Sequence, residues 1–124
     1  MVRFQDLDRS LRFYCDTLCV QKVRRETFTD AKFTLVLSDM PTAARRLSSY
    51  NWGDTSYSHG TGYGHIALEV QDIQQVCNRL SEFGINIVRA PGPMKRAPDE
   101  TAEREIIAFI YDPDGCRIEL IQAP

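Results

Sequence analysis

A histidine and a glutamate in the C-terminal half of the chain have the residue types and the spacing of a possible metal-binding pair. His65 stands near the head of the strand-like stretch GYGHIALEV, residues 62–70. Alternate side chains of a strand point to opposite faces, so His65 points away from the apolar residues that alternate with it. Glu119 alternates in the same way with apolar neighbours in CRIELI, residues 116–121. We therefore expect an imidazole and a carboxylate on one face of a curved sheet.

Two interpretations of this pair follow from its chemistry. An imidazole nitrogen and a carboxylate oxygen suit Zn, Ni, Co, Mn or Fe, and two ligands do not identify the metal. In the structural alternative, His65 pairs with a neighbour on a solvated sheet face and Glu119 is an ordinary exposed carboxylate. Spacing alone leaves both interpretations open.

The elements that would position the pair belong to an internal repeat. Phe4-Gln5-Asp6-Leu7 and Val70-Gln71-Asp72-Ile73 each end a strand-like stretch with an Asp that can cap a helix. Apolar residues at helical spacing follow each copy. Asp72 and Gln75 also have the spacing of a capping box, and Gly84 is placed to end the second helix. In the first copy Cys19 stands where such a glycine is expected.

Three strand-like segments follow each predicted helix. They are 21–27, 32–38 and 44–50 in the first copy, and 86–90, 105–111 and 116–121 in the second. The turn sequence DPDG, residues 112–115, predicts a hairpin between the last two. The chain is therefore predicted to be α+β, with two βαβββ modules in a single domain, residues 1–124. Module one covers about 1–50, a linker about 51–62 and module two about 63–124, with a long exposed loop over 91–103.

Composition limits the class of protein. The chain has 124 residues, 43% of them hydrophobic, and a net charge of -2. This composition predicts a soluble globular domain with a small-molecule partner. Nucleic-acid binding would need a concentrated basic face, and a membrane span would need a run of roughly 18 apolar residues. Without a signal-like start we expect the cytoplasm. The cysteines, which lack a C-x-x-C pair, predict reduced and mostly buried thiols. They are Cys15, Cys19, Cys77 and Cys116.

Several motifs, in order along nearly the whole chain, resemble the glyoxalase I (lactoylglutathione lyase) family of the vicinal oxygen chelate superfamily, in its bacterial-type pattern. They are MVR (1–3), DLDRSLRFY (6–14), NWG (51–53), GYGHIAL (62–68), GPMK (92–95) and DPDGCRIELI (112–121). The resemblance implies paired βαβββ modules that form curved half-barrel sheets. It also implies a homodimer whose active sites lie between modules of different subunits.

The resemblance further implies a divalent metal, with Ni or Co favoured and Zn possible, held by a His and a Glu from each module. His65 and Glu119 match the pair of the second module. In the first module the position of the His falls upstream of Met1, where a longer chain would carry it, and that of the Glu falls on Leu47. Two of four ligands are therefore absent from this sequence. Nearby residues considered as replacements, among which the sequence gives no reason to choose, are Ser48, Ser49, Asp54 and His59.

The reaction implied by the resemblance joins methylglyoxal to glutathione as co-substrate. The hemithioacetal of the two is isomerised to S-lactoylglutathione by metal-assisted proton transfer, with Glu119 as both ligand and base. Arg3 and Asn51 match residues that meet the γ-glutamyl carboxylate, and Lys95 with Arg96 matches the region that meets the glycyl carboxylate. The alternative for each cation is a solvated surface charge.

Two other functions remain open on the sequence. Because two ligands are absent, the chain is alternatively a catalytically weakened member of the superfamily that binds glutathione conjugates or another small molecule. The second is a dimerisation partner that supplies His65 and Glu119 to a complete homologue.

Overall fold

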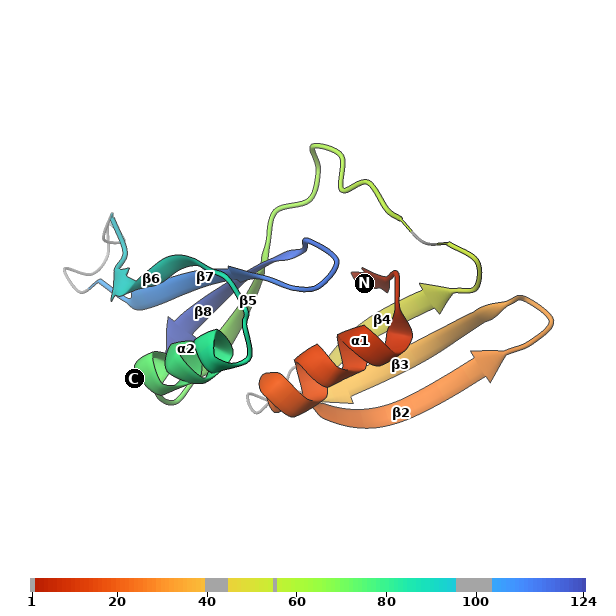
Figure 1. The fold of residues 1–124 in the computed structure, drawn as a ribbon, viewed down its shortest axis with the longest axis horizontal. Coiled ribbons are helices and arrows are strands. Elements are labelled where there is room, and N and C mark those ends of the chain that lie inside the picture. The colour runs from red at the N-terminus through yellow and green to blue at the C-terminus, as the bar shows by residue number, and fades with distance from the viewer. Residues whose placement is uncertain (1, 40–44, 55, 96–103) are drawn as a thin grey trace. The chain divides into compact units, whose positions relative to one another are not determined.

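The computed structural model consists of two compact units, Met1–Gly62 and Tyr63–Pro124. It describes residues 2–39, 45–54, 56–95 and 104–124, with the backbone alone for 45–47. Each unit contains one helical segment and one four-stranded sheet (Figure 1). The predicted α+β class with two βαβββ modules is confirmed.

The first unit runs through six elements. They are β1 Val2–Phe4, α1 Leu7–Leu11, the π-helix η1 Arg12–Thr17, β2 Gln21–Phe28, β3 Phe33–Asp39 and β4 Arg45–Asn51. The sheet order is β1-β4-β3-β2, with β1 and β4 parallel and the other pairs antiparallel. The strands lie within one residue of the predicted ranges, and Asn51 ends β4 where the linker was expected to begin.

The second unit repeats this topology. Its elements are β5 Ile66–Val70, α2 Ile73–Glu82, β6 Ile87–Pro93, β7 Ile106–Tyr111 and β8 Arg117–Gln122. The order β5-β8-β7-β6 again joins the first and last strands in parallel at one side of the sheet. Glu119 lies in β8, and His65 immediately precedes its parallel partner β5.

Both helical segments begin at the predicted aspartates. The Asp6 carboxylate accepts a hydrogen bond from the Arg9 backbone N–H, and the Asp72 carboxylate accepts one from the Gln75 N–H, both at 2.9 Å. Each bond satisfies a donor that the helix itself leaves unpaired. The two caps confirm that the repeated sequence marks the same structural position in both units.

The ends of the two helical segments differ in one respect that the sequence did not reveal. Gly84 ends α2 with φ +76°, and Cys19 follows η1 with φ +57°, as expected for a left-handed position. The first segment has one residue more between its cap and this position. The π-helix, in which the Leu18 N–H donates to the Phe13 carbonyl five residues earlier, accommodates that residue.

Helix α2 covers one face of the second sheet. It packs on β6, β7 and β8 through a stripe that is buried in the core. The stripe consists of Ile73, Cys77 and Leu80, and the fully buried strand residues are Ala108, Ile110, Ile118 and Leu120. Since side chains alternate along a strand, the residues between these strand positions face away from α2. The candidate site lies on that opposite face.

The predicted hairpin between β7 and β8 is confirmed. The Asp112 carboxylate accepts hydrogen bonds from the backbone N–H groups of Asp114 (2.9 Å) and Cys116 (2.7 Å), and Gly115 has φ +80°. An Asp that bonds its own following backbone is a local turn device. It fixes the register of β7 against β8, the strand that carries Glu119.

The predicted loop over 91–103 was wrong in its first part. Strand β6 continues through Pro91, Gly92 and Pro93, with register shifts on its pairing with β7. The strand lies at the edge of the sheet, where a residue without an N–H leaves no ladder bond unmade. Residues 96–103 lie outside the described part of the chain.

The thiol prediction is partly corrected. None of the four cysteines, all of which the structure describes, forms a disulfide; Cys77 and Cys116 are buried and Cys15 is half-buried, but Cys19 is exposed. Cys19 is exposed because it occupies the left-handed position at the end of the helical segment, outside the apolar stripe. In the described part of the chain, no helix has the length and apolar content to cross a lipid bilayer.

Candidate active site

The structure brings His65 and Glu119 together. His65 Nε2 lies 3.0 Å from Glu119 Oε2. Glu119 lies in β8, in register with Ala67 of the adjacent parallel strand β5. His65 immediately precedes β5 and is two residues before Ala67, so it lies on the same side as Glu119. The His65 side chain is 42% exposed and that of Glu119 13% exposed, so the pair is accessible from solvent while its carboxylate is largely shielded.

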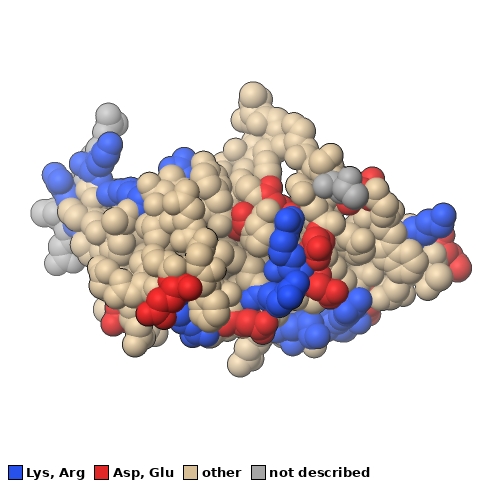
Figure 2. Space-filling view, in the orientation of Figure 1, with Lys and Arg blue, Asp and Glu red and all other residues tan. Residues whose placement is uncertain are grey.

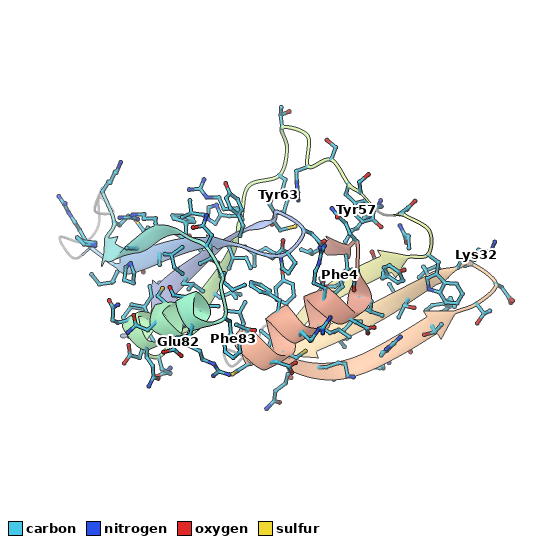
Figure 3. The ribbon with its side chains drawn as sticks, in the orientation of Figure 1. Phe4, Lys32, Tyr57, Tyr63, Glu82 and Phe83 are labelled. Atoms are coloured by element: carbon cyan, nitrogen blue, oxygen red, sulfur yellow. The ribbon has the colours of Figure 1, made fainter. Side chains whose placement is uncertain are left out.

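The neighbouring residue Phe109 supports the imidazole. It is in register with Glu119 across the β7–β8 ladder, so both side chains lie on the face away from α2. The His65 and Phe109 rings meet edge to face, with centroids 5.6 Å apart and an interplanar angle of 90°. Such a contact is a favoured aromatic geometry and restricts the rotation of His65. The Tyr63 hydroxyl, labelled in Figure 3, donates to the Arg117 carbonyl at 3.4 Å and ties the approach to β5 to β8.

The donor atoms of this pair fit a transition-metal cation. Two ligand atoms that each lie about 2.1 Å from one cation are about 3.0 Å apart in octahedral geometry and about 3.4 Å apart in tetrahedral geometry, and His65 Nε2 and Glu119 Oε2 are 3.0 Å apart. Among the described residues, no group of three or more His, Cys, Asp or Glu side chains is positioned to hold a metal. The pair therefore supplies two ligands, and a catalytic site needs at least one more.

The first unit carries a leucine at the position that corresponds to Glu119. In the parallel ladders, Leu68 pairs with Leu120 in the second unit as Val2 pairs with Ser48 in the first. One residue earlier on the last strand is Glu119 in one unit and Leu47 in the other. The strand register therefore identifies position 47 as the equivalent of position 119. The leucine side chain has no lone pair to donate to a cation.

Arg3 and Asn51 share one face of the first sheet. Arg3 of β1 is in register with Ser49 of β4, and Asn51 lies two residues further along β4, which places it on the same side. The Arg3 guanidinium lies 5.9 Å from the centre of the Tyr57 ring, a cation–π distance. An exposed guanidinium and an amide on one face are suited to binding a carboxylate.

Lys95 lies at a pocket of the second unit, whereas Arg96 lies outside the described residues. The pocket has a volume of about 440 Å³ and is lined by Arg89, Met94, Lys95, Phe109 and Arg117. Sequence reasoning singled out only Lys95 of these five. Phe109 and Arg117 could have been found from the DPDG turn, because the hairpin register that it sets places Phe109 opposite Glu119.

The buried thiol of Cys116 shares the alternation of Ile118 and Leu120, so it points to their side of the sheet and not to that of Glu119. Burial, together with the neighbouring Asp112 carboxylate, raises the pKa of the Cys116 thiol from its ordinary 9.0 to about 12. A reactive cysteine requires the opposite shift. The chemistry of this face therefore belongs to the imidazole, the carboxylate and the cations around the pocket.

Residues 1–120 match the model of the Glyoxalase/Bleomycin resistance protein/Dioxygenase superfamily. The chain is 42% identical over 126 residues to a probable lactoylglutathione lyase of Synechocystis sp., with 98% of this chain and 91% of the relative covered. It is 41% identical over 125 residues to a lactoylglutathione lyase of Haemophilus influenzae, covering 98% and 88%.

Solved structures of similar fold include two glyoxalase I enzymes. That of Zea mays superimposes with a TM-score of 0.85 at 31% identity, over 98% of this chain; the chain spans only 42% of the maize polypeptide. That of Leishmania major gives a TM-score of 0.76 at 31% identity, covering 98% of this chain and 82% of the other.

Proposed function

Because this chain belongs to the Glyoxalase/Bleomycin resistance protein/Dioxygenase superfamily, we propose that it is a lactoylglutathione lyase-like enzyme. Its substrate is the hemithioacetal of methylglyoxal and glutathione, and its product is S-lactoylglutathione. The observation that carries the proposal is the pairing of His65 Nε2 with Glu119 Oε2 at 3.0 Å on the sheet face opposite α2. Relatives named lactoylglutathione lyase, about two fifths identical over nearly the whole chain, support it.

The reaction moves one proton between neighbouring carbons of the substrate and one from the hydroxyl oxygen of the first carbon to the carbonyl oxygen of the second, so that the hemithioacetal becomes a hydroxy thioester. The Glu119 carboxylate takes the proton from the carbon that bears sulfur, beside the carbonyl, and returns it to the former carbonyl carbon. A carboxylate 13% exposed is accessible to substrate and yet partly desolvated, which suits proton exchange with carbon. His65, held against the Phe109 ring, fixes the position of the Glu119 carboxylate.

A divalent metal, Ni or Co with Zn as the alternative, is the cofactor that this donor pair suits. When bound, it supplies Lewis-acid polarisation of the substrate oxygens. His65 and Glu119 would be its ligands from the second unit. With leucine at position 47, further ligands would have to come from solvent or from other residues.

Glutathione is bound at its two acidic ends in this proposal. Arg3 and Asn51, which share a face of the first sheet, meet the γ-glutamyl carboxylate. Lys95, with Arg96, meets the glycyl carboxylate; the pocket position of Lys95 supports this role. An Arg fork binds a carboxylate bidentately and so orients the substrate as well as retaining it. We further propose a homodimer in the cytoplasm.

Turnover of the hemithioacetal tests the proposal directly. Metal-free protein is supplied in turn with Ni²⁺, Co²⁺ and Zn²⁺, and S-lactoylglutathione formation is followed by its absorbance. We expect a rate above buffer with at least one metal, a higher rate for Leu47→Glu, and no enzymatic rate for Glu119→Gln. No rate above buffer for wild type and Leu47→Glu with any metal would refute the lyase.

Leu47 favours one second candidate, a binding protein for glutathione conjugates, because it removes a carboxylate from the repeat position of Glu119. That function predicts that S-methylglutathione raises the melting temperature of the protein while no turnover occurs. An unchanged melting temperature across a series of glutathione conjugates would exclude it.

A further inference from the structure

Arg3 lies on a short edge strand that does little to orient its long side chain. Strand β1 has three residues, pairs with β4 alone, and carries Arg3 on the face that also holds Asn51. An arginine side chain has many rotamers, and fixing one of them costs entropy when a ligand binds. Among the described residues, no carboxylate forms an ion pair with Arg3. The support that the structure describes for this guanidinium is therefore uncharged.

The support is the ring of Tyr57. The Arg3 Cζ atom lies over this ring, 5.9 Å from its centre, within the range of a cation–π contact. Tyr57, labelled in Figure 3, is half-buried, and its hydroxyl oxygen is shielded from solvent. Ser49, in register with Arg3, is 5% exposed, so larger side chains cover this part of the sheet. A half-buried ring moves less than an exposed one and offers the guanidinium a defined surface.

The segment that carries Tyr57 is anchored to the first sheet at its start. The Trp52 backbone N–H donates to the Lys32 carbonyl at 2.9 Å, and the Trp52 indole N–H donates to the Thr34 hydroxyl at 3.2 Å. Thr34 is 1% exposed, so the indole is bonded to a group inside the core. These two bonds fix where the chain leaves β4 on its way to Tyr57.

The same segment brings no charge that would compete for Arg3. Residues 56–62 include no Lys, Arg, Asp or Glu, and Figure 2 shows them as the tan stretch at the top of the view. A carboxylate beside Arg3 would occupy the N–H donors that an anionic ligand needs. An aromatic ring attracts a guanidinium without accepting those donors in conventional hydrogen bonds. Tyr57 can therefore orient Arg3 and leave its donors to a ligand.

We propose that Tyr57 is a positioning residue that holds the Arg3 guanidinium in place for the α-carboxylate of the γ-glutamyl group. The inference rests on the proposed function, which assigns that carboxylate to Arg3 and Asn51. In this role Tyr57 contacts the guanidinium and not the substrate, so its effect on binding passes through Arg3. A guanidinium that is oriented beforehand loses less freedom on binding, which increases the preference of the site for a carboxylate over an uncharged group.

Equilibrium binding of two unreactive probes tests this role without requiring turnover. They are S-methylglutathione and its analogue in which the α-carboxylate of the γ-glutamyl group is an amide. Calorimetry gives the dissociation constants for wild type, Tyr57→Leu, Tyr57→Phe, Arg3→Gln and the double variant Arg3→Gln/Tyr57→Leu. Phe28→Leu is the matched control, because it also removes an aromatic contact of the first sheet. That contact is the stacking of Phe28 on Phe33 at 4.6 Å, and Phe28 lies on β2, at the other edge of the sheet.

We expect wild type to bind the carboxylate probe about tenfold more tightly than the amide probe. Tyr57→Leu should reduce this ratio to about threefold, because the guanidinium then loses more freedom on binding. Tyr57→Phe, which keeps the ring, should keep the wild-type ratio, as should Phe28→Leu. Arg3→Gln should abolish the ratio, and the double variant should bind as Arg3→Gln does, since the two side chains act through one contact.

The positioning role fails if Tyr57→Leu keeps the wild-type ratio, if Tyr57→Phe or Phe28→Leu lowers it as much as Tyr57→Leu does, or if the double variant binds the carboxylate probe more weakly than Arg3→Gln. Tyr57→Gln, which also removes the ring, replaces the leucine variant should that one not fold. Wild type that binds the two probes equally, or binds neither, overturns the role of Arg3 and this inference with it. Failure of the lyase proposal gives a different result, in which binding depends on Tyr57 while the hemithioacetal is not turned over with any metal.

Discussion

Glu119 is the side chain on which the proposed chemistry depends most. It is the only carboxylate of the described residues that lies within 3.0 Å of the His65 imidazole, and it comes from a strand whose alternate residues are fully buried. A base on a rigid strand is positioned more precisely than a base on a loop. Substitutions at this position should therefore change catalysis without unfolding the protein.

We predict that Glu119→Gln lowers kcat by about 10²- to 10⁴-fold, because the amide keeps the shape of the side chain and cannot accept the substrate proton. Glu69→Gln is the matched control, an exposed carboxylate on the adjacent strand β5. Steady-state turnover with the active metal measures both variants. Equal activities for the two variants would show that Glu119 is not the base.

The buried thiol of Cys116 gives a prediction of pH dependence. Burial raises its pKa to about 12 in the folded protein, against 9.0 for an ordinary thiol. Between these values the unfolded chain has lost a proton that the folded chain retains, so the free energy of unfolding falls as pH rises. Below pH 9 the contribution is constant.

Melting temperatures between pH 8 and pH 11 measure this slope. We expect Cys116→Ala to show a smaller decrease over that range than wild type, whatever its absolute stability. Cys19→Ala, at an exposed cysteine, should retain the wild-type slope. A decrease in Cys116→Ala as steep as that of wild type would contradict the assignment.

At the level of elements, the helix caps are the best-defined local signals. We predict that Asp72→Ala lowers the free energy of unfolding by about 1 kcal/mol, because it removes the acceptor of the Gln75 N–H. Asp72→Asn should remain close to wild type, since an asparagine side chain also caps. Urea denaturation at constant m-value measures both variants. Equal losses for the two would mean that charge, rather than the cap, stabilises α2.

The left-handed helix end gives a second prediction for an element. Gly84 has φ +76°, and a Cβ atom there would have no heavy atom within 4 Å, so its cost comes from the backbone alone. We expect Gly84→Ala to lower the free energy of unfolding by about 1 kcal/mol. Gly62→Ala, at a glycine without positive φ, should cause no such loss. Identical unfolding midpoints for Gly84→Ala and wild type would contradict it.

The elements also show where sequence reasoning succeeds and where it stops. Asp6 and Asp72 are predictable because a cap is a local interaction. The π-helix is not, since one additional residue in an amphipathic stretch leaves the apolar stripe almost unchanged. The continuation of β6 through Pro91 and Pro93 depends on the strand being at the sheet edge, which is a property of the whole topology.

At the scale of the whole molecule, the residues predicted to act on the substrate come from both units. His65, Glu119 and the pocket around Phe109 belong to the second unit, and Arg3 and Asn51 belong to the first. Alternation was sufficient to predict that His65 and Glu119 share a face, because a strand has a strict period of two. The pocket around Phe109 depends on pairing among three strands, so Arg89 and Arg117 were not predicted. That the two modules form a single domain stays a prediction.

Calorimetric titration of metal-free protein with Ni²⁺ tests most directly whether His65 and Glu119 hold a divalent cation. We predict that wild type binds Ni²⁺ and that His65→Ala and Glu119→Gln each weaken binding at least tenfold, while Glu69→Gln binds as wild type does. Equal binding by all four proteins, or none by wild type, would contradict the metal site.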